Sequence, residues 1–416
     1  MLSEAKRILQ SSTLKTLGVF AGGSLLVSLI GGLGGLLQAR WVAPEVFGEF
    51  RKYGILTSYF YIGLVFVHDG LTRQYPYLIG KKQKKEALET AAVAKWWYLL
   101  MSWFFTLVFV ILSLTSLVQN NIYASIGWLA QIAMVWTVYY GAYLNVMYRT
   151  SSDFKQLSYN NLAASVLNFG LLVLVKFWGY WGLALRFVFA SVLSVVINRH
   201  FVPVKVKAEW NAKRFVDLAK ISLPLSMPGY INTSFLGATL SYFILKYSGE
   251  HGLGLYGIAI TFQAFALTFT AALNQIFTVK LTSKFGETER VSECLKYAMI
   301  PTVLSILVGS LMAVGLCLTI KPFIGFLLPK YSDAISVIQI LSLSIPLAAA
   351  ALPLVIFRSA LWYKSFFTYT IIRFIACLLC IALFSKTLTG IVISSVVAEF
   401  ASLLIGYVIL WFRKDN

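Results

Sequence analysis

The sequence consists mostly of apolar runs of about 20–25 residues separated by short polar segments. Runs of this length are long enough for an α-helix to cross a bilayer, and they lack the strict alternation of a membrane β-barrel strand. Because unpaired backbone groups are costly in lipid, the pattern predicts transmembrane helices. About twelve are predicted, at residues 17–38, 51–68, 93–118, 122–148, 157–178, 180–200, 221–245, 253–279, 295–319, 332–357, 363–385 and 388–412.

Composition supports lipid as the solvent for most of the chain. Hydrophobic residues make up 59% of the 416 residues and charged residues only 12%, whereas about 25% of the residues in a soluble domain are charged. So few charges leave too little polar surface to face water on all sides. The expected fold class is therefore an all-α integral membrane protein.

The distribution of Lys and Arg predicts the orientation. Most of the 35 basic residues fall in the segments that share a side with the N-terminus, and cytoplasmic loops are the ones enriched in Lys and Arg. Both termini are therefore expected in the cytoplasm. The net charge of +19 is spread over separate loops, so it indicates topology and contact with anionic lipid rather than nucleic-acid binding. The other side carries few basic residues: Arg40, Arg51, Lys52, Lys176, Lys246, Lys321, Lys330 and Lys386.

The chain also repeats itself weakly. Residues 40–50 match residues 246–256 at a shift of 206, each with a basic residue, a turn and then Gly-x-aromatic. The pair His68-Asp69 falls opposite Asn274-Gln275 at the same shift, and Arg149 falls opposite Arg358 at a shift of 209. We therefore expect two six-helix lobes, 1–205 and 206–416, related by a pseudo-two-fold axis along the membrane normal. Substrate sites usually lie between such lobes.

The six-plus-six helix pattern comes with a basic mid-chain loop and two short stretches, Phe47-Gly48-Glu49-Phe50 and Asp69-Gly70-Leu71-Thr72-Arg73. With these features the chain resembles, over its whole length, the Wzx-type lipid-linked oligosaccharide flippases, of the superfamily that also holds the multidrug and toxin exporters. The resemblance implies translocation of undecaprenyl-pyrophosphate-linked repeat units to the outer leaflet of a bacterial inner membrane, for surface polysaccharides such as O-antigen. Polysaccharide polymerase and chain-length enzymes are the partners that it implies.

Charged residues inside the predicted spans are candidates for such a task. The clear cases are Arg186, Arg373 and Glu399, and a charge at the bilayer centre by default faces a cavity or a partner. At ~1.5 Å per residue, Arg373 lies about 13 Å from the inner side and Glu399 about 18 Å from the outer side. Their depths nearly coincide on consecutive helices. Two interpretations follow. The residues form either an ion pair that locks the two helices together, or a substrate-binding Arg373 with Glu399 as its switchable counter-ion.

Arg186 has no acidic residue within reach in its own span, which favours a cavity role for it. Arginine suits this role because its planar fork binds phosphate oxygens bidentately. Further candidate contacts for the substrate head group are Arg51, Lys246, Asn274 and Gln275. Arg51 is equally explained as a membrane-interface anchor, and the two amides as hydrogen-bonding glue between helices.

Asp69 and Arg73 lie four residues apart on one helical face, near the inner end of the second helix. This spacing is typical of a surface ion pair worth a few tenths of a kcal/mol. The alternative is a proton- or cation-coupling site formed by Asp69 with His68 beside it.

Other chemistry is disfavoured. The pair Cys377 and Cys380 has redox-motif spacing but lies in an apolar helix, and neither a Walker A motif nor a His-Glu-x-x-His helix occurs. We therefore expect no enzyme activity, cofactor or metal. The alternatives to a flippase are a multidrug exporter, which should offer carboxylates to cations, and a membrane polysaccharide polymerase or ligase. The latter needs a large outer loop, and the longest one predicted here is roughly 39–50.

Overall fold

The structure, a computed structural model, describes residues 12–151, 153–288, 290–360, 362–384 and 386–412. The side chains of residues 12–21, 269–280 and 282–289 are among those outside this description. Every regular element among the described residues is a helix, and none of them lies in a strand. All of the predicted spans are present as helical segments. The predicted all-α class is thus confirmed.

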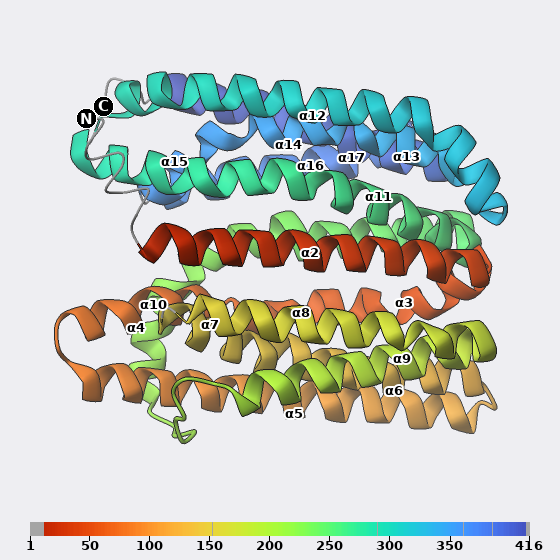
Figure 1. Cartoon of the computed structure of the whole chain (residues 1–416), viewed down its shortest axis with the longest axis horizontal. Coiled ribbons are helices and arrows are strands. Elements are labelled where there is room, and N and C mark those ends of the chain that lie inside the picture. Colours follow the sequence, from red (N-terminus) through yellow and green to blue (C-terminus); the bar gives the residue numbers. More distant parts are fainter. Residues whose placement is uncertain (1–11, 152, 289, 361, 385, 413–416) are drawn as a thin grey trace. The chain divides into compact units, whose positions relative to one another are not determined.

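The first compact unit consists of the chain up to Gly34 together with Phe60–Ser226. Within it, α5 packs along α6, and α9 packs along both α6 and α8 (Figure 1). Tyrosines fill much of its core, since Tyr98, Tyr139 and Tyr148 are fully buried. Its helices are α2 (Ser12–Trp41, as far as Gly34), η1 (Tyr61–Leu64), α4 (His68–Gly80), α5 (Lys84–Val118), α6 (Ile122–Trp136), η2 (Thr137–Gly141), α7 (Ala142–Thr150), α8 (Phe154–Gly170), α9 (Leu172–His200) and most of α10 (Ala212–Tyr230).

The second unit consists of Gly35–Tyr59 and the chain from Met227 onward. In it α16 packs along α17, and α12 packs on α11 and α14. Cys294, Phe357 and Leu403 belong to its buried apolar core. Its helices are α3 (Pro44–Phe60), η3 (Ile231–Phe235), α11 (Leu236–Thr288), α12 (Val291–Leu327), η4 (Pro329–Tyr331), α13 (Ala334–Ser342), α14 (Ser344–Ala350), η5 (Leu352–Val355), α15 (Ile356–Ser359), α16 (Tyr363–Phe384) and α17 (Leu388–Phe412).

These units do not follow the predicted division of the sequence at residue 205. Residues 35–59 pack with the second unit although they belong to the first half of the sequence, and residues 206–226 pack with the first unit. The organisation into two sequence halves stays a prediction, and residues 35–59 are the segment of most interest below.

Two glycines reverse the chain inside helices α9 and α11. Gly179 has a φ of +53° and Gly249 a φ of +64°, a backbone conformation that other residues rarely adopt. Gly179 lies between the predicted spans 157–178 and 180–200, and Gly249 between 221–245 and 253–279. Gly249 therefore joins two spans within α11, whereas Gly179 joins the end of the span 157–178, most of which lies in α8, to the span 180–200.

The predicted outer loop at residues 39–50 is mostly helical. Helix α2 continues to Trp41 and α3 begins at Pro44, so only Val42 and Ala43 connect them. Proline is favoured in the first turn of a helix, and Glu45 beside it suits the positive end of the helix dipole. The hydropathy pattern missed this start because the first two turns of α3 are partly polar.

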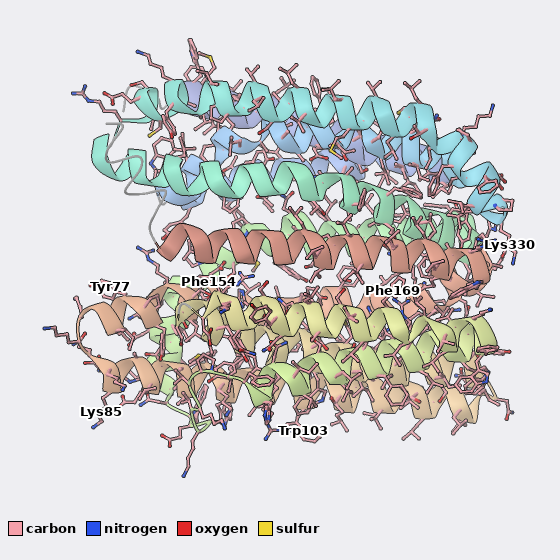
Figure 2. The ribbon with its side chains drawn as sticks, in the orientation of Figure 1. Tyr77, Lys85, Trp103, Phe154, Phe169 and Lys330 are labelled. Carbon is pink, nitrogen blue, oxygen red and sulfur yellow. The ribbon has the colours of Figure 1, made fainter. Side chains whose placement is uncertain are left out.

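Apolar side chains cover the outward faces of the long helices. On α5 a stripe of Trp103, Leu107, Ile111 and Leu114 is 52–63% exposed, and Figure 2 shows Trp103 projecting away from its helix. So large an exposed apolar face does not occur in a soluble monomer, whereas lipid would cover it. Eight helices among the described residues are long and apolar enough to cross a membrane.

A substitution at Gly182 tests how closely the two chain segments on either side of the Gly179 turn pack together. A Cβ at this position would overlap the carbonyl oxygen of Leu174, so Gly182→Ala is expected to lower the free energy of unfolding by about 1–3 kcal/mol. The matched control is Gly170→Ala, where a Cβ has no described atom within 4 Å. Unfolding of the purified protein in mixed micelles measures both, and equal stabilities would contradict the packing described.

Candidate functional site

Arg373 and Glu399 form an ion pair inside the second unit. The Nη2 atom of Arg373 on α16 lies 3.4 Å from a carboxylate oxygen of Glu399 on α17, and the two side chains are 18% and 15% exposed. The Nη1 atom donates a hydrogen bond of 2.8 Å to the side-chain oxygen of Asn232. The Nε atom is buried without a hydrogen-bond partner. The predicted neighbours are thus brought together, and the guanidinium keeps one donor free.

Asn232 reaches the arginine from a break in the helix that precedes α11. The segment Ile231–Phe235 (η3) is a single π-helical turn, of the kind often found at functional sites. Pro224 and Pro228 lie just before it and remove backbone donors from the preceding turns. A neutral amide thereby comes within reach of Arg373.

Aromatic side chains lie beside this polar group in the sequence, since Phe374 follows Arg373 and Phe235 comes three residues after Asn232. The ring of Phe235 lies 5.2 Å from that of Phe374 and 5.3 Å from that of Tyr59. The hydroxyl of Tyr230 donates to the main-chain oxygen of Tyr59 at 2.8 Å. These half-buried rings and the Arg373 group occupy one region of the second unit.

Arg186 occupies a polar site inside the first unit. Its Nε atom donates to the side-chain oxygen of Asn168 at 3.0 Å and to the main-chain oxygen of the same residue at 3.3 Å. Gly34 on α2 lies beside it, since a Cβ at Gly34 would be 3.7 Å from Nη2. The Asn168 amide is uncharged, so this contact does not neutralise the arginine.

The basic pair Arg51 and Lys52, in the middle of α3, lies in the second unit. Lys52 contacts Glu49 at 2.5 Å and Glu250 at 3.1 Å. Arg51 lies 5.4 Å from the ring centroid of Phe47 and packs against Gly257. The two neighbouring cations therefore differ, because Lys52 contacts two carboxylates and Arg51 contacts an aromatic ring and a glycine.

His68 and Asp69 lie in polar surroundings within the first unit. The Nδ1 atom of His68 is 3.1 Å from the hydroxyl of Tyr98. The hydroxyl of Ser226 donates to Asp69 at 2.8 Å. Arg73 is exposed.

The remaining candidates are less informative. Lys246 is exposed and lies 5.5 Å from the ring of Tyr247. Asn274 and Gln275 belong to α11, but their side chains are outside the described part of the structure. Asn168 and Asn232 were not among the predicted site residues, although an amide in an apolar span is the signal that would have found them.

Comparison with known protein families finds a match over most of this sequence. A family of proteins described as polysaccharide biosynthesis protein matches residues 37–330, which is more than half of the chain. The chain belongs to this polysaccharide biosynthesis family. No curated protein sequence matches it.

Solved structures identify the fold of this family member. It is similar to an inward-facing multidrug resistance MATE transporter of the MOP superfamily, with 15% identity, a TM-score of 0.73 and coverage of 93% of this chain and 94% of the other. It is also similar to an outward-facing one, with 16% identity, a TM-score of 0.64 and coverage of 98% and 97%. Identities this low show the fold alone, which is that of a two-lobed membrane transporter.

A third similar structure has a different pocket. This MOP superfamily transporter from Pyrococcus furiosus is described as having a binding pocket of reverse polarity that suggests a different function. Its identity with this chain is 15% and its TM-score 0.62, with coverage of 98% of this chain and 97% of the other. The fold thus accommodates pockets of more than one charge character.

The ion pair of Arg373 with Glu399 generates a stability prediction. Removing one member leaves the other charge partly buried, so Arg373→Gln and Glu399→Gln should each lower the free energy of unfolding by about 2–4 kcal/mol. The double variant should lose less than the sum, with a coupling of about 1–3 kcal/mol.

The control is the exposed pair Arg290 and Glu293, whose side chains are 76% and 43% exposed. Its coupling should be about 0–1 kcal/mol. A double-mutant cycle in mixed micelles measures both pairs, and additive losses at Arg373 and Glu399 would show that the ion pair contributes nothing.

Proposed function

We propose that this protein flips lipid-linked oligosaccharides, with the sugar head joined to undecaprenyl by pyrophosphate, from the cytoplasmic to the outer leaflet. The observation that carries the proposal is the match to polysaccharide biosynthesis proteins on a chain that has a transporter fold. Such a substrate combines a polar head, an anionic linker and a long apolar tail. Moving it needs a wet, cationic path between the lobes and no covalent chemistry.

Two arginines inside the spans suit the anionic part of this substrate. Arg186 donates to the neutral amide of Asn168, and Arg373 keeps one buried nitrogen donor free. Guanidinium groups bind phosphate oxygens through paired, charge-assisted hydrogen bonds. We assign head-group binding to these two, with Arg51, Lys246, Asn274 and Gln275 as further contacts.

Glu399 has the role of a replaceable partner in this proposal. In the structure it holds Arg373 together with Asn232. A pyrophosphate that displaces the carboxylate gains a bidentate contact without leaving the arginine unpaired at any stage. Asp69, with His68 beside it and Arg73 one turn away, is the proposed coupling site for a proton or another cation.

The orientation follows from the loops. Cytoplasmic termini put the lysine-rich loops inside, in line with the enrichment of basic residues in cytoplasmic loops. The proposed location is the bacterial inner membrane. A polymerase and chain-length enzymes that use the flipped repeat unit are the proposed partners. A multidrug exporter remains the second candidate, because two of the similar structures are multidrug transporters.

Transport in proteoliposomes tests the proposal. The protein should translocate a fluorescent undecaprenyl-pyrophosphate oligosaccharide, and Arg186→Ala or Arg373→Ala should lower the rate at least about tenfold, the loss expected from one charge-assisted hydrogen bond or more. The control is Arg290→Ala, since Arg290 is exposed at a helix end. Efflux of cationic dyes without movement of any such lipid would reassign the protein as a drug exporter.

The membrane potential should drive much of this flux. An outward-moving pyrophosphate with about two negative charges gains roughly 4–5 kcal/mol per 100 mV in an inside-negative cell, at ~2.3 kcal/mol per charge. Setting the potential with potassium and valinomycin should therefore raise the initial rate of outward flipping, and collapsing it should lower that rate. Flux that stays the same after the collapse would rule out this energy source.

A further inference from the structure

Residues that are equivalent in the sequence repeat contact one another. A Cβ on Gly48 would overlap the carbonyl oxygen of Glu250, and a Cβ on Gly254 would overlap the carbonyl oxygen of Pro44. The repeat shift of 206 converts Pro44 into Glu250 and Gly48 into Gly254. The two contacts are therefore copies of each other, which is the signature of an interface around a two-fold axis.

Other pairs show the direction of this axis. Glu45 lies 2.6 Å from its own repeat equivalent, His251, and Arg51 packs against its own equivalent, Gly257. These self-equivalent pairs recur at intervals of three residues along each helix, through Gly48 with Gly254. Only two helices that run parallel about a local two-fold axis along their length make such a series. Glycines at the crossing let the two backbones touch.

Polar pairs flank the crossing, beside the buried rings of Phe47 and Phe50. Lys52 reaches Glu250 at 3.1 Å, His251 lies 3.7 Å from Asp333, and Tyr331 donates to the main-chain oxygen of Val42 at 3.1 Å. The charged side chains are 26–74% exposed. Water can replace exposed partners of this kind at little cost. These polar pairs can therefore part and re-form.

The path of the chain shows what a relative movement of the two units would require of this contact. Residues 35–59, which include most of α3, pack with the second unit, yet the chain continues into the first unit at both ends of this segment. A movement of one unit against the other must therefore bend the chain near residues 34–35 and 59–60, or separate α3 from the helix that begins after Gly249.

We infer that residues 44–52 and 250–257, the outer seam, close one end of the transport path and separate once in each cycle. The inference rests on the proposed function in requiring alternating access, but not on the identity of the substrate. On the proposed orientation the seam closes the outer end. The Gly48–Gly254 crossing makes the closed state compact, and the polar pairs around it make that state reversible.

Thr239 reports whether the seam is closed. It is 9% exposed, and the hydroxyl of Tyr59 on α3 lies 3.2 Å from its own. In a variant that lacks the four native cysteines, Thr239→Cys should react slowly with a membrane-impermeant maleimide added outside. Adding Gly48→Ala and Gly254→Ala should speed labelling by about tenfold, because the methyl groups prevent closure and shift the population to the open state.

The control is Gly315→Ala, where a Cβ would have no described atom within 4 Å. It should leave the labelling rate unchanged. Equal rates in the seam variant and the control, with both proteins folded, would overturn the inference whether or not the protein moves lipids.

A second variant holds the seam closed instead of open, and it adds no methyl group at the backbone crossing. Glu45→Cys with His251→Cys, joined by a reducible bifunctional thiol reagent, should hold the seam closed. Transport should stop, and reduction should restore it. Full transport through the cross-linked protein would also overturn the inference, whereas the labelling result stands even if no transported lipid is found.

Discussion

The free-energy cost of burying a charged side chain away from water determines which residues can lie beside the arginines inside this protein. An ionised group at the bilayer centre is tolerated only beside a partner or a wet cavity, and both arginines inside the spans satisfy this condition in different ways. Arg373 meets a carboxylate and an amide, whereas Arg186 meets an amide and a main-chain oxygen. The helices position these partners, and the fold thereby stabilises charged side chains that would be too costly in lipid alone.

This constraint explains why the sequence predicts the helices well. Lipid removes every alternative to a helix for an apolar run of this length, and glycine is the residue that permits a turn with positive φ at Gly179 and Gly249. The start of α3 was missed because Glu45 faces His251 across the seam and Glu49 faces Lys52 on its own helix, rather than lipid. Local hydropathy carries no information about such partners.

The candidate site was predictable only in part, for a related reason. Helix rise alone places Arg373 and Glu399 at similar depths, and they lie 3.4 Å apart. Asn232 could not be assigned to the same group, because its position depends on the π-helical turn at Ile231–Phe235. A shift of one residue in helical register rotates a side chain by about 100°, and a hydropathy pattern does not specify where the extra residue enters.

The sequence repeat is preserved among the residues of the seam, but the two arginines inside the spans have no charged equivalents in the repeat. At the seam, Pro44, Glu45, Gly48 and Arg51 each contact repeat equivalents, whereas at a shift of 206 Arg373 falls opposite Leu167 and Arg186 opposite Val392. A contact that must close and open gains from symmetry, because both sides separate together. The proposed substrate, with a sugar at one end and a tail at the other, has no such symmetry, so the groups proposed to bind it should differ between the two sequence repeats.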